Sequence, residues 1–180
     1  LVLGLKNVYS TFFFMNDKAD SGKIINQKKL KVLKRDNSWR LYNRLTNLAS
    51  KQLISILTRI KHRSNSYSSQ SKIKIFKRKY NLWRKRNFKD GSIDWRMSGK
   101  NIENLVRALD KPFPGSFFTF KNKLYKVWQI KFKKRNDLEN IEPGKVIGLH
   151  KKSPEIKCGE GSVVIKKVSP NLNVKIGDYL

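Results

Sequence analysis

The sequence is short of acidic residues. It holds 13 Asp and Glu against 41 Lys and Arg, a formal net charge of +28, and no acidic residue occurs between Asn37 and Lys89. A surface with so little negative charge attracts polyanions, of which nucleic acid is the commonest. The alternative is a lysine-rich coding bias that merely leaves a solvated surface, and composition does not separate the two.

Cysteine is nearly absent as well. The single Cys158 excludes an internal disulfide framework and a CxxC metal site, and it suits a reducing, cytoplasmic location. No apolar run approaches the roughly 18 residues that span a bilayer, so we expect no membrane segment. Because Cys158 has no second cysteine to form a CxxC site, we also expect no metal. The chain opens on Leu1 rather than Met, directly in apolar sequence, which predicts that an upstream portion is missing.

The chain contains enough apolar residues to form the core of one ordinary domain or of two small ones. They make up 38% of the total, and 11% of the residues are aromatic. Residues 8–15 are aromatic and β-branched, which favours a buried strand. A polar loop at 16–22 follows, and 23–32 resumes an extended pattern.

A long helix is predicted after Asp36, its candidate N-cap. The positions that keep a 3.6-residue spacing are Leu41, Leu45, Leu48, Ala49, Leu53, Ile56, Leu57 and Ile60. Such a helix packs one face on a core. Two strands, a polar loop and a covering helix fit the closing part of an α/β sheet domain.

The next segment is polar and then strongly basic. Residues 63–71 (RSNSYSSQS) are typical of a linker. The candidate nucleic-acid-binding residues that follow are Lys72, Lys74, Lys77, Arg78, Lys79, Arg84, Lys85 and Arg86. Because Phe76, Tyr80 and Trp83 lie among them, the segment combines phosphate-binding cations with base-stacking rings. Alternatively, the aromatics anchor a linker and the lysines only remain in water.

A short amphipathic helix and several strands make up the remainder. Ser98 is a candidate N-cap, and Ile102, Leu105, Val106 and Leu109 share one helical face. Pro112 and Pro114 end that helix. Five short strands then follow, at 116–120, 124–132, 145–150, 155–158 and 162–168, and their spacing predicts a small closed or nearly closed barrel.

Several motifs occur in the order of one known family. They are residues 11–15 (TFFFM) with 19–22 (ADSG), 91–95 (GSIDW), 104–109 (NLVRAL) with 112–115 (PFPG), and 143–147 (PGKVI) with 158–161 (CGEG). Together they resemble the C-terminal half of the folate-dependent formyltransferases, which include the methionyl-tRNA and amino-sugar branches. The resemblance covers nearly the whole chain.

The resemblance implies an α/β plus β fold. Residues 1–64 would close a Rossmann-like catalytic domain, residues 65–89 would form the basic linker, and residues 90–180 would form a C-terminal OB-like barrel. It also implies an activity, formyl transfer from 10-formyltetrahydrofolate to an amine.

In the family an Asn-x-His pair carries out most of the chemistry, and an Asp orients the His. The Asp corresponds to Asp20, the candidate catalytic residue. The Asn and His correspond to nothing here, because neither His62 nor His150 stands in that context, and we expect structural or surface roles for both. The family's folate-contacting loops lie upstream of Leu1, so the isolated chain is expected to be inactive.

Four other residues have competing interpretations. Asp17 is expected to be a solvated loop residue. Arg107 is either a surface arginine or the partner of a carboxylate such as Asp94. Trp95 and Trp128 are expected in the core.

Three functions remain open. Charge favours methionyl-tRNA as the acceptor, since OB-like barrels commonly hold nucleic acid. The local sequence at 83–86 (WRKR), 104–108 (NLVRA) and 156–159 (IKCG) is at least as close to the branch that formylates nucleotide-linked amino sugars. The third possibility is a non-catalytic RNA-binding module.

Overall fold

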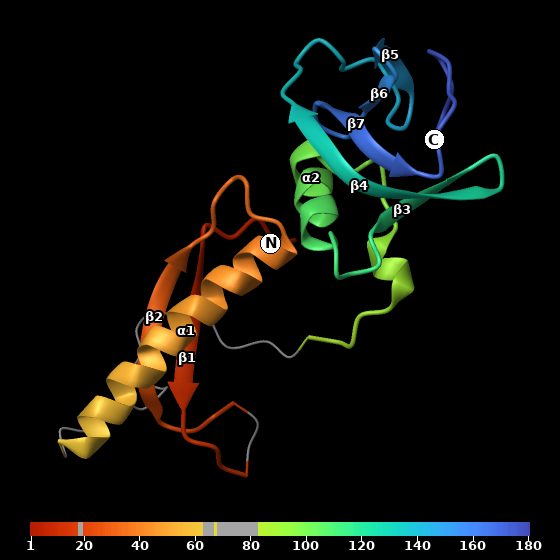
Figure 1. Cartoon of the computed structure of the whole chain (residues 1–180). Coiled ribbons are helices and arrows are strands. Elements are labelled where there is room, and N and C mark those ends of the chain that lie inside the picture. The colour runs from red at the N-terminus through yellow and green to blue at the C-terminus, as the bar shows by residue number, and fades with distance from the viewer. Residues whose placement is uncertain (18–19, 63–66, 68–82) are drawn as a thin grey trace. The chain divides into compact units, whose positions relative to one another are not determined.

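The computed structural model describes residues 1–17, 20–62, 67 and 83–180, which form two compact units (Figure 1). One unit comprises Lys6–Lys34 and Arg40–Lys85. The other comprises Leu1–Leu5, Arg35–Trp39 and Arg86–Leu180. The domain boundaries at residues 64 and 89 remain predictions.

The first unit is a hairpin with a helix beside it (Figure 1). Strands β1 (Asn7–Phe13) and β2 (Ile24–Lys31) pair antiparallel, and helix α1 (Ser38–Lys61) runs alongside. The buried Gln52 ties the helix to the hairpin, because its Nε2 donates to Ser10 O at 3.2 Å and to Asn26 Oδ1 at 2.8 Å. The predicted order of two strands and a long helix is confirmed.

The buried face of α1 is narrower than its apolar pattern predicted. Leu41 and Ile56 are buried, whereas Leu53, Leu57 and Ile60 are about half exposed. The expectation that all eight spaced positions pack on a core is therefore wrong for these three. Two strands cover only a narrow stripe of a helix, and in the described residues that stripe is centred on Gln52. The helix begins at Ser38, so Asp36 lies too far upstream to be its N-cap.

The second unit is built on helix α2 (Gly99–Ala108). Ser98 caps it as predicted, since its side chain accepts from Asn101 N at 3.2 Å. Ile102, Leu105 and Val106 are buried. The helix lies against strand β4 (Figure 1), where Glu103 Oε1 accepts from Phe132 N at 3.1 Å.

Five strands form the sheet of this unit. They are β3 (Ser116–Phe120), β4 (Lys123–Lys133), β5 (Val146–His150), β6 (Ser153–Lys157) and β7 (Ser162–Ser169). All neighbours are antiparallel and the order is β3-β4-β7-β6-β5. The five predicted strands are confirmed.

The sequence predicted a closed or nearly closed barrel; a closed barrel is not formed, and an OB-like barrel is not confirmed. In the described part of the chain β3 and β5 are the two edges, and no ladder of hydrogen bonds joins them. Helix α2 covers the core instead, and Val127, Val146, Ile156 and Val163 of the sheet are fully buried with Ile102 of the helix.

A short 3-10 turn, η2 (Phe88–Gly91), leads into this unit.

Candidate functional site

Asp20 lies in the loop that joins β1 to β2. It is exposed and its backbone is left-handed, with φ +52°, a conformation that Asp and Asn adopt more readily than most residues. Beside it, Ser21 Oγ donates to Asn16 Oδ1 at 2.8 Å. Asp20 thus lies at an exposed position in the loop at the end of a two-stranded hairpin.

The Asp-Ser-Gly motif needs glycine at position 22, because the neighbouring backbone leaves no room for a side chain there. A Cβ on Gly22 would lie 1.6 Å from the carbonyl oxygen of Phe14. The Phe14 N–H donates to Lys23 O at 3.0 Å and closes the loop at that point. Any side chain at Gly22 would force these strands apart, and with them the loop that carries Asp20.

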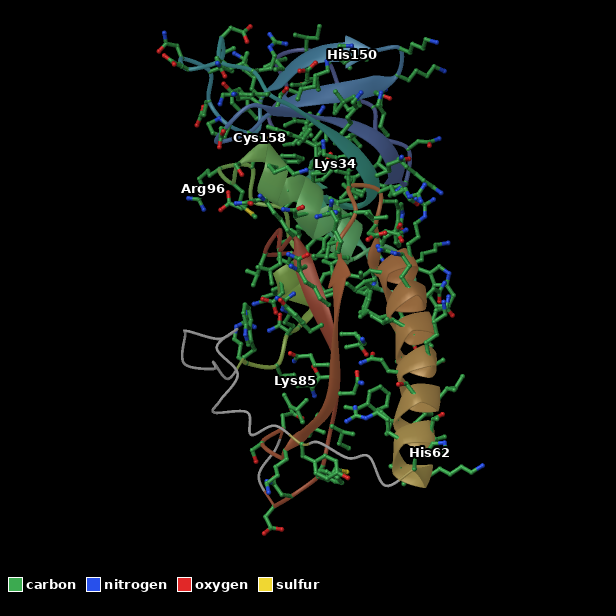
Figure 2. The ribbon with its side chains drawn as sticks, turned by 90° about the vertical axis from the view of Figure 1, so that its left-hand side faces the viewer. Lys34, His62, Lys85, Arg96, His150 and Cys158 are labelled. Atoms are coloured by element: carbon green, nitrogen blue, oxygen red, sulfur yellow. The ribbon has the colours of Figure 1, made fainter. Side chains whose placement is uncertain are left out.

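Neither histidine stands in an Asn-x-His sequence, and the two lie on different elements (Figure 2). His62 follows the last turn of α1, where its backbone N–H donates to Thr58 O at 3.1 Å. His150 ends β5, and its Nε2 contacts the carboxylate of Glu155. The surface or structural role expected of His150 stays a prediction, and this contact supports a structural one.

Glu155 is the centre of a polar cluster that sequence reasoning missed. Its side chain is only 3% exposed. The carboxylate accepts hydrogen bonds from Lys133 Nζ at 2.8 Å and Ser162 Oγ at 2.6 Å. It also contacts His150 Nε2 and forms an ion pair with Arg135 Nη1 at 3.5 Å. Burial alone would raise the pKa of this carboxyl. The hydrogen bonds from Lys133, Ser162 and His150 outweigh it and lower the pKa to about 2.

Only part of the predicted basic segment can be located. Lys72, Lys74, Lys77, Arg78 and Lys79 lie outside the described residues. Arg84, Lys85 and Arg86 are exposed, and Arg84 Nη1 donates to Lys85 O at 3.3 Å. These three side chains are therefore accessible to a large anionic partner.

Arg107 does not pair with Asp94. The Asp94 carboxylate is held by Arg96, at 2.9 Å from Nε and 2.8 Å from Nη2, and hydrogen bonding from that guanidinium lowers the pKa of Asp94 to about 2. Arg107 instead donates from Nε to Asn104 Oδ1 at 3.0 Å and from Nη1 to the carbonyl of Asp36 at 3.4 Å. It joins α2 to the segment that precedes α1, within one compact unit.

The two tryptophans predicted in the core differ. Trp95 is buried and meets Phe118 edge-on at 5.5 Å between ring centroids. Trp128 is only partly buried and lines an open groove of about 730 Å³. The alternation of β4 could have indicated this, because Trp128 follows the fully buried Val127 and so faces the other side of the sheet.

Comparison with known proteins identifies the family of the second unit. Residues 87–176 match the domain described as "Formyl transferase, C-terminal domain". The chain belongs to the formyltransferase family. The family resemblance seen in the motifs is thereby confirmed, and members of this family are enzymes.

Two curated relatives of this formyltransferase chain have different names. Methionyl-tRNA formyltransferase of Natranaerobius thermophilus is 27% identical over 171 residues, which cover 89% of this chain and 50% of the relative. Bifunctional polymyxin resistance protein ArnA of Wigglesworthia glossinidia brevipalpis is 33% identical over 162 residues, which cover 87% of this chain and 24% of the relative. The chain thus spans about half the length of the first relative and a quarter of the second.

A solved structure shares the fold. The N-formyltransferase from Helicobacter canadensis, in complex with folinic acid and dTDP-3-aminofucose, has a TM-score of 0.67 and 14% identity over 92% of this chain and 57% of that one.

In the described part of this chain, no helix has the length and apolarity to cross a bilayer. No group of three His, Cys, Asp or Glu side chains there is placed to hold a metal ion.

Proposed function

We propose that this chain takes part in formyl transfer from 10-formyltetrahydrofolate to the amino group of methionyl-tRNA, in translation initiation and in the cytoplasm. The observation that carries the proposal is the similarity to a methionyl-tRNA formyltransferase over 89% of the chain. The net charge of +28 supports it, because an RNA acceptor is a polyanion and a nucleotide sugar is not.

The chemistry assigns a positioning role to Asp20. The amine nitrogen attacks the formyl carbon, an oxyanion forms, and the amine loses a proton. The bond between the formyl carbon and the folate nitrogen then breaks, and that nitrogen takes up a proton as tetrahydrofolate leaves. A carboxylate at Asp20 would accept a hydrogen bond from the imidazole that handles this proton and stabilise its charged form. The 180 residues contain no Asn-x-His sequence, so the imidazole and amide must come from other polypeptide.

The loop that carries Asp20 would not hold the formyl donor alone. Asp20 is exposed, so the described residues of its loop do not enclose a folate by themselves. We therefore expect the isolated chain to bind folate weakly and to show no turnover. Formyl transfer by the isolated chain would contradict this expectation.

Asp20 can be tested in a chimaera that joins the N-terminal half of a methionyl-tRNA formyltransferase to this chain. We expect Asp20→Ala to lower the transfer rate by at least about 100-fold, the usual range for a group in general acid–base catalysis. The matched control is Asp17→Ala in the same loop, which should keep most of the activity. Equal effects of the two substitutions would remove Asp20 from the site.

The acceptor is tested by binding. We expect the chain to bind tRNA in a gel shift, with an affinity that falls steeply as salt rises. Changing Arg84, Lys85 and Arg86 to Ala should lower the slope of log affinity against log salt by about 2 to 3. The matched control changes Lys151, Lys152 and Lys175 to Ala, three exposed lysines outside the predicted basic segment, and should leave the slope closer to that of the unaltered chain. Salt-independent or absent binding would contradict a tRNA acceptor.

A nucleotide-linked amino sugar is the second candidate. The observation in its favour is the fold shared with the Helicobacter canadensis enzyme, whose structure contains dTDP-3-aminofucose. Calorimetric titration with a dTDP-linked amino sugar separates the two, since this candidate predicts saturable binding of the sugar and little binding of tRNA. A non-catalytic RNA-binding module would bind tRNA and leave the chimaera inactive.

A further inference from the structure

The open groove beside Trp128 lies wholly within the second unit. Three aromatic side chains line it, Trp39, Phe113 and Trp128, together with the lysines Lys111 and Lys126. None of these residues belongs to the basic segment or to the loop that carries Asp20. The groove is therefore a separate surface feature that the proposed function leaves unexplained.

The fold presents the rings of this groove to solvent. Val127 is fully buried in the core, so its neighbours on β4, Lys126 and Trp128, project from the opposite face. Gly115 backs the Trp128 ring, since a Cβ there would lie 3.1 Å from it. Trp39 and Phe113 are 52% and 51% exposed, so both side chains are open to a ligand in the groove.

The groove also carries an excess of positive charge. Lys111 Nζ stands 5.8 Å from the centroid of the Trp128 ring, and Lys126 lies on the same face of β4. The one carboxylate in the lining, Asp110, is engaged on both oxygens. Its Oδ2 accepts from Asn37 Nδ2 at 2.7 Å and its Oδ1 accepts from Lys111 N at 2.8 Å.

We propose that this groove binds unpaired nucleotides of an RNA, with a base stacked on the aromatic side chains and the adjoining phosphates at Lys111 and Lys126. Rings with cations beside them are the usual surface for single-stranded nucleic acid. An apolar protein segment would bury both lysine ammonium groups without an anion. This inference rests on the proposed function only because it takes RNA as the partner. It adds the surface that would hold an unpaired stretch of that RNA.

The first test is binding of a uridine decamer to the 180-residue chain, followed by fluorescence polarisation and by quenching of tryptophan emission. Stacking predicts quenching on binding. Trp39→Ala with Phe113→Ala should weaken binding by about tenfold or more, and both side chains are exposed enough for the fold to tolerate their removal. The matched control is Tyr179→Ala, an exposed ring under Lys145 at 5.6 Å in the same unit but outside the groove. Equal affinity of the double variant and the control would overturn the proposal.

The second test separates the lysines from the rings. Lys111→Ala with Lys126→Ala should lower the slope of log affinity for the decamer against log salt by about 1.4, because each phosphate that a lysine neutralises on a single strand contributes about 0.7. Lys145→Ala with Lys175→Ala is the control with the same change of net charge and should leave the slope closer to that of the unaltered chain. An equal fall in both pairs would overturn the groove as a specific site.

The outcomes also separate this inference from the proposed acceptor. If tRNA binds and the groove variants bind the decamer normally, the groove proposal alone fails. If the decamer binds through the groove while tRNA does not bind, the groove stands and methionyl-tRNA fails as the acceptor.

Discussion

Ser162 Oγ donates a 2.6 Å hydrogen bond to Glu155 Oε1 between neighbouring strands. Ser162 pairs with Lys157 in the β6–β7 register, so Glu155 and Ser162 are diagonal neighbours on one face of the sheet. Lys133 of β4 and His150 of β5 complete the ring of donors. One buried carboxylate therefore links four strands of the sheet.

Glu155→Gln should destabilise the fold in a pH-dependent way. The pKa of Glu155 is lowered from 4.5 to about 2, so its ionised form contributes stability that is present above pH 4.5 and is lost as the pH falls toward 2. Lys133 and His150 are partly exposed and screened by water, so we expect a loss of about 2 kcal/mol at pH 7. Urea unfolding at pH 7 and at pH 2.5 measures it, and Glu160→Gln, at an exposed position, is the control. A pH-independent difference would contradict the assignment.

Cys158 should be unreactive in the folded protein. Burial raises the pKa of its thiol from 9.0 to about 12, which lowers the thiolate fraction at pH 8 by about a thousandfold. The side chain is also fully buried, so reagents cannot reach it. Ellman's reagent should label the chain within minutes in denaturant and only through unfolding without it. Because the chain has one cysteine, the signal has no background, and rapid labelling of the native protein would contradict the buried position.

Gly22→Ala should disrupt the loop that carries Asp20. The added methyl group would lie 1.6 Å from the Phe14 carbonyl oxygen, so the hairpin must open, at a cost of about 2 kcal/mol or more. Gly148→Ala is the control, since a Cβ there meets nothing nearer than 3.9 Å. Hydrogen exchange of the Phe14 amide reports the loop directly. Unchanged protection of that amide in Gly22→Ala would show that the loop geometry is different.

A pair of neighbouring substitutions tests which face of α1 is buried. Ile56→Ala should cost about 2 to 4 kcal/mol, because Ile56 is buried and its removal leaves a cavity. Leu57→Ala should cost less than about 1 kcal/mol, because Leu57 is more than half exposed. Thermal unfolding followed by circular dichroism compares them. Equal losses would mean that both faces of the helix are covered in solution.

The sequence alone predicted the kinds and order of the elements, because periodicity records which side of a helix or strand avoids water. The Ser98 cap and the apolar face of α2 were visible in this way. The family motifs marked Asp20 and Gly22 without any knowledge of the fold, although the role of Asp20 remains a proposal. The same periodicity failed for Leu53 and Leu57, because an apolar stripe does not say how wide its partner is.

The tertiary structure decided which residues meet. The order β3-β4-β7-β6-β5 brings Lys133, His150 and Ser162 around Glu155. It leaves the sheet open, where the sequence predicted a closed or nearly closed barrel. Trp39 and Trp128 reach one groove from distant parts of the chain. Local pattern fixes the face on which each side chain lies, but strand order and helix placement come from long-range packing, and no local pattern encodes them.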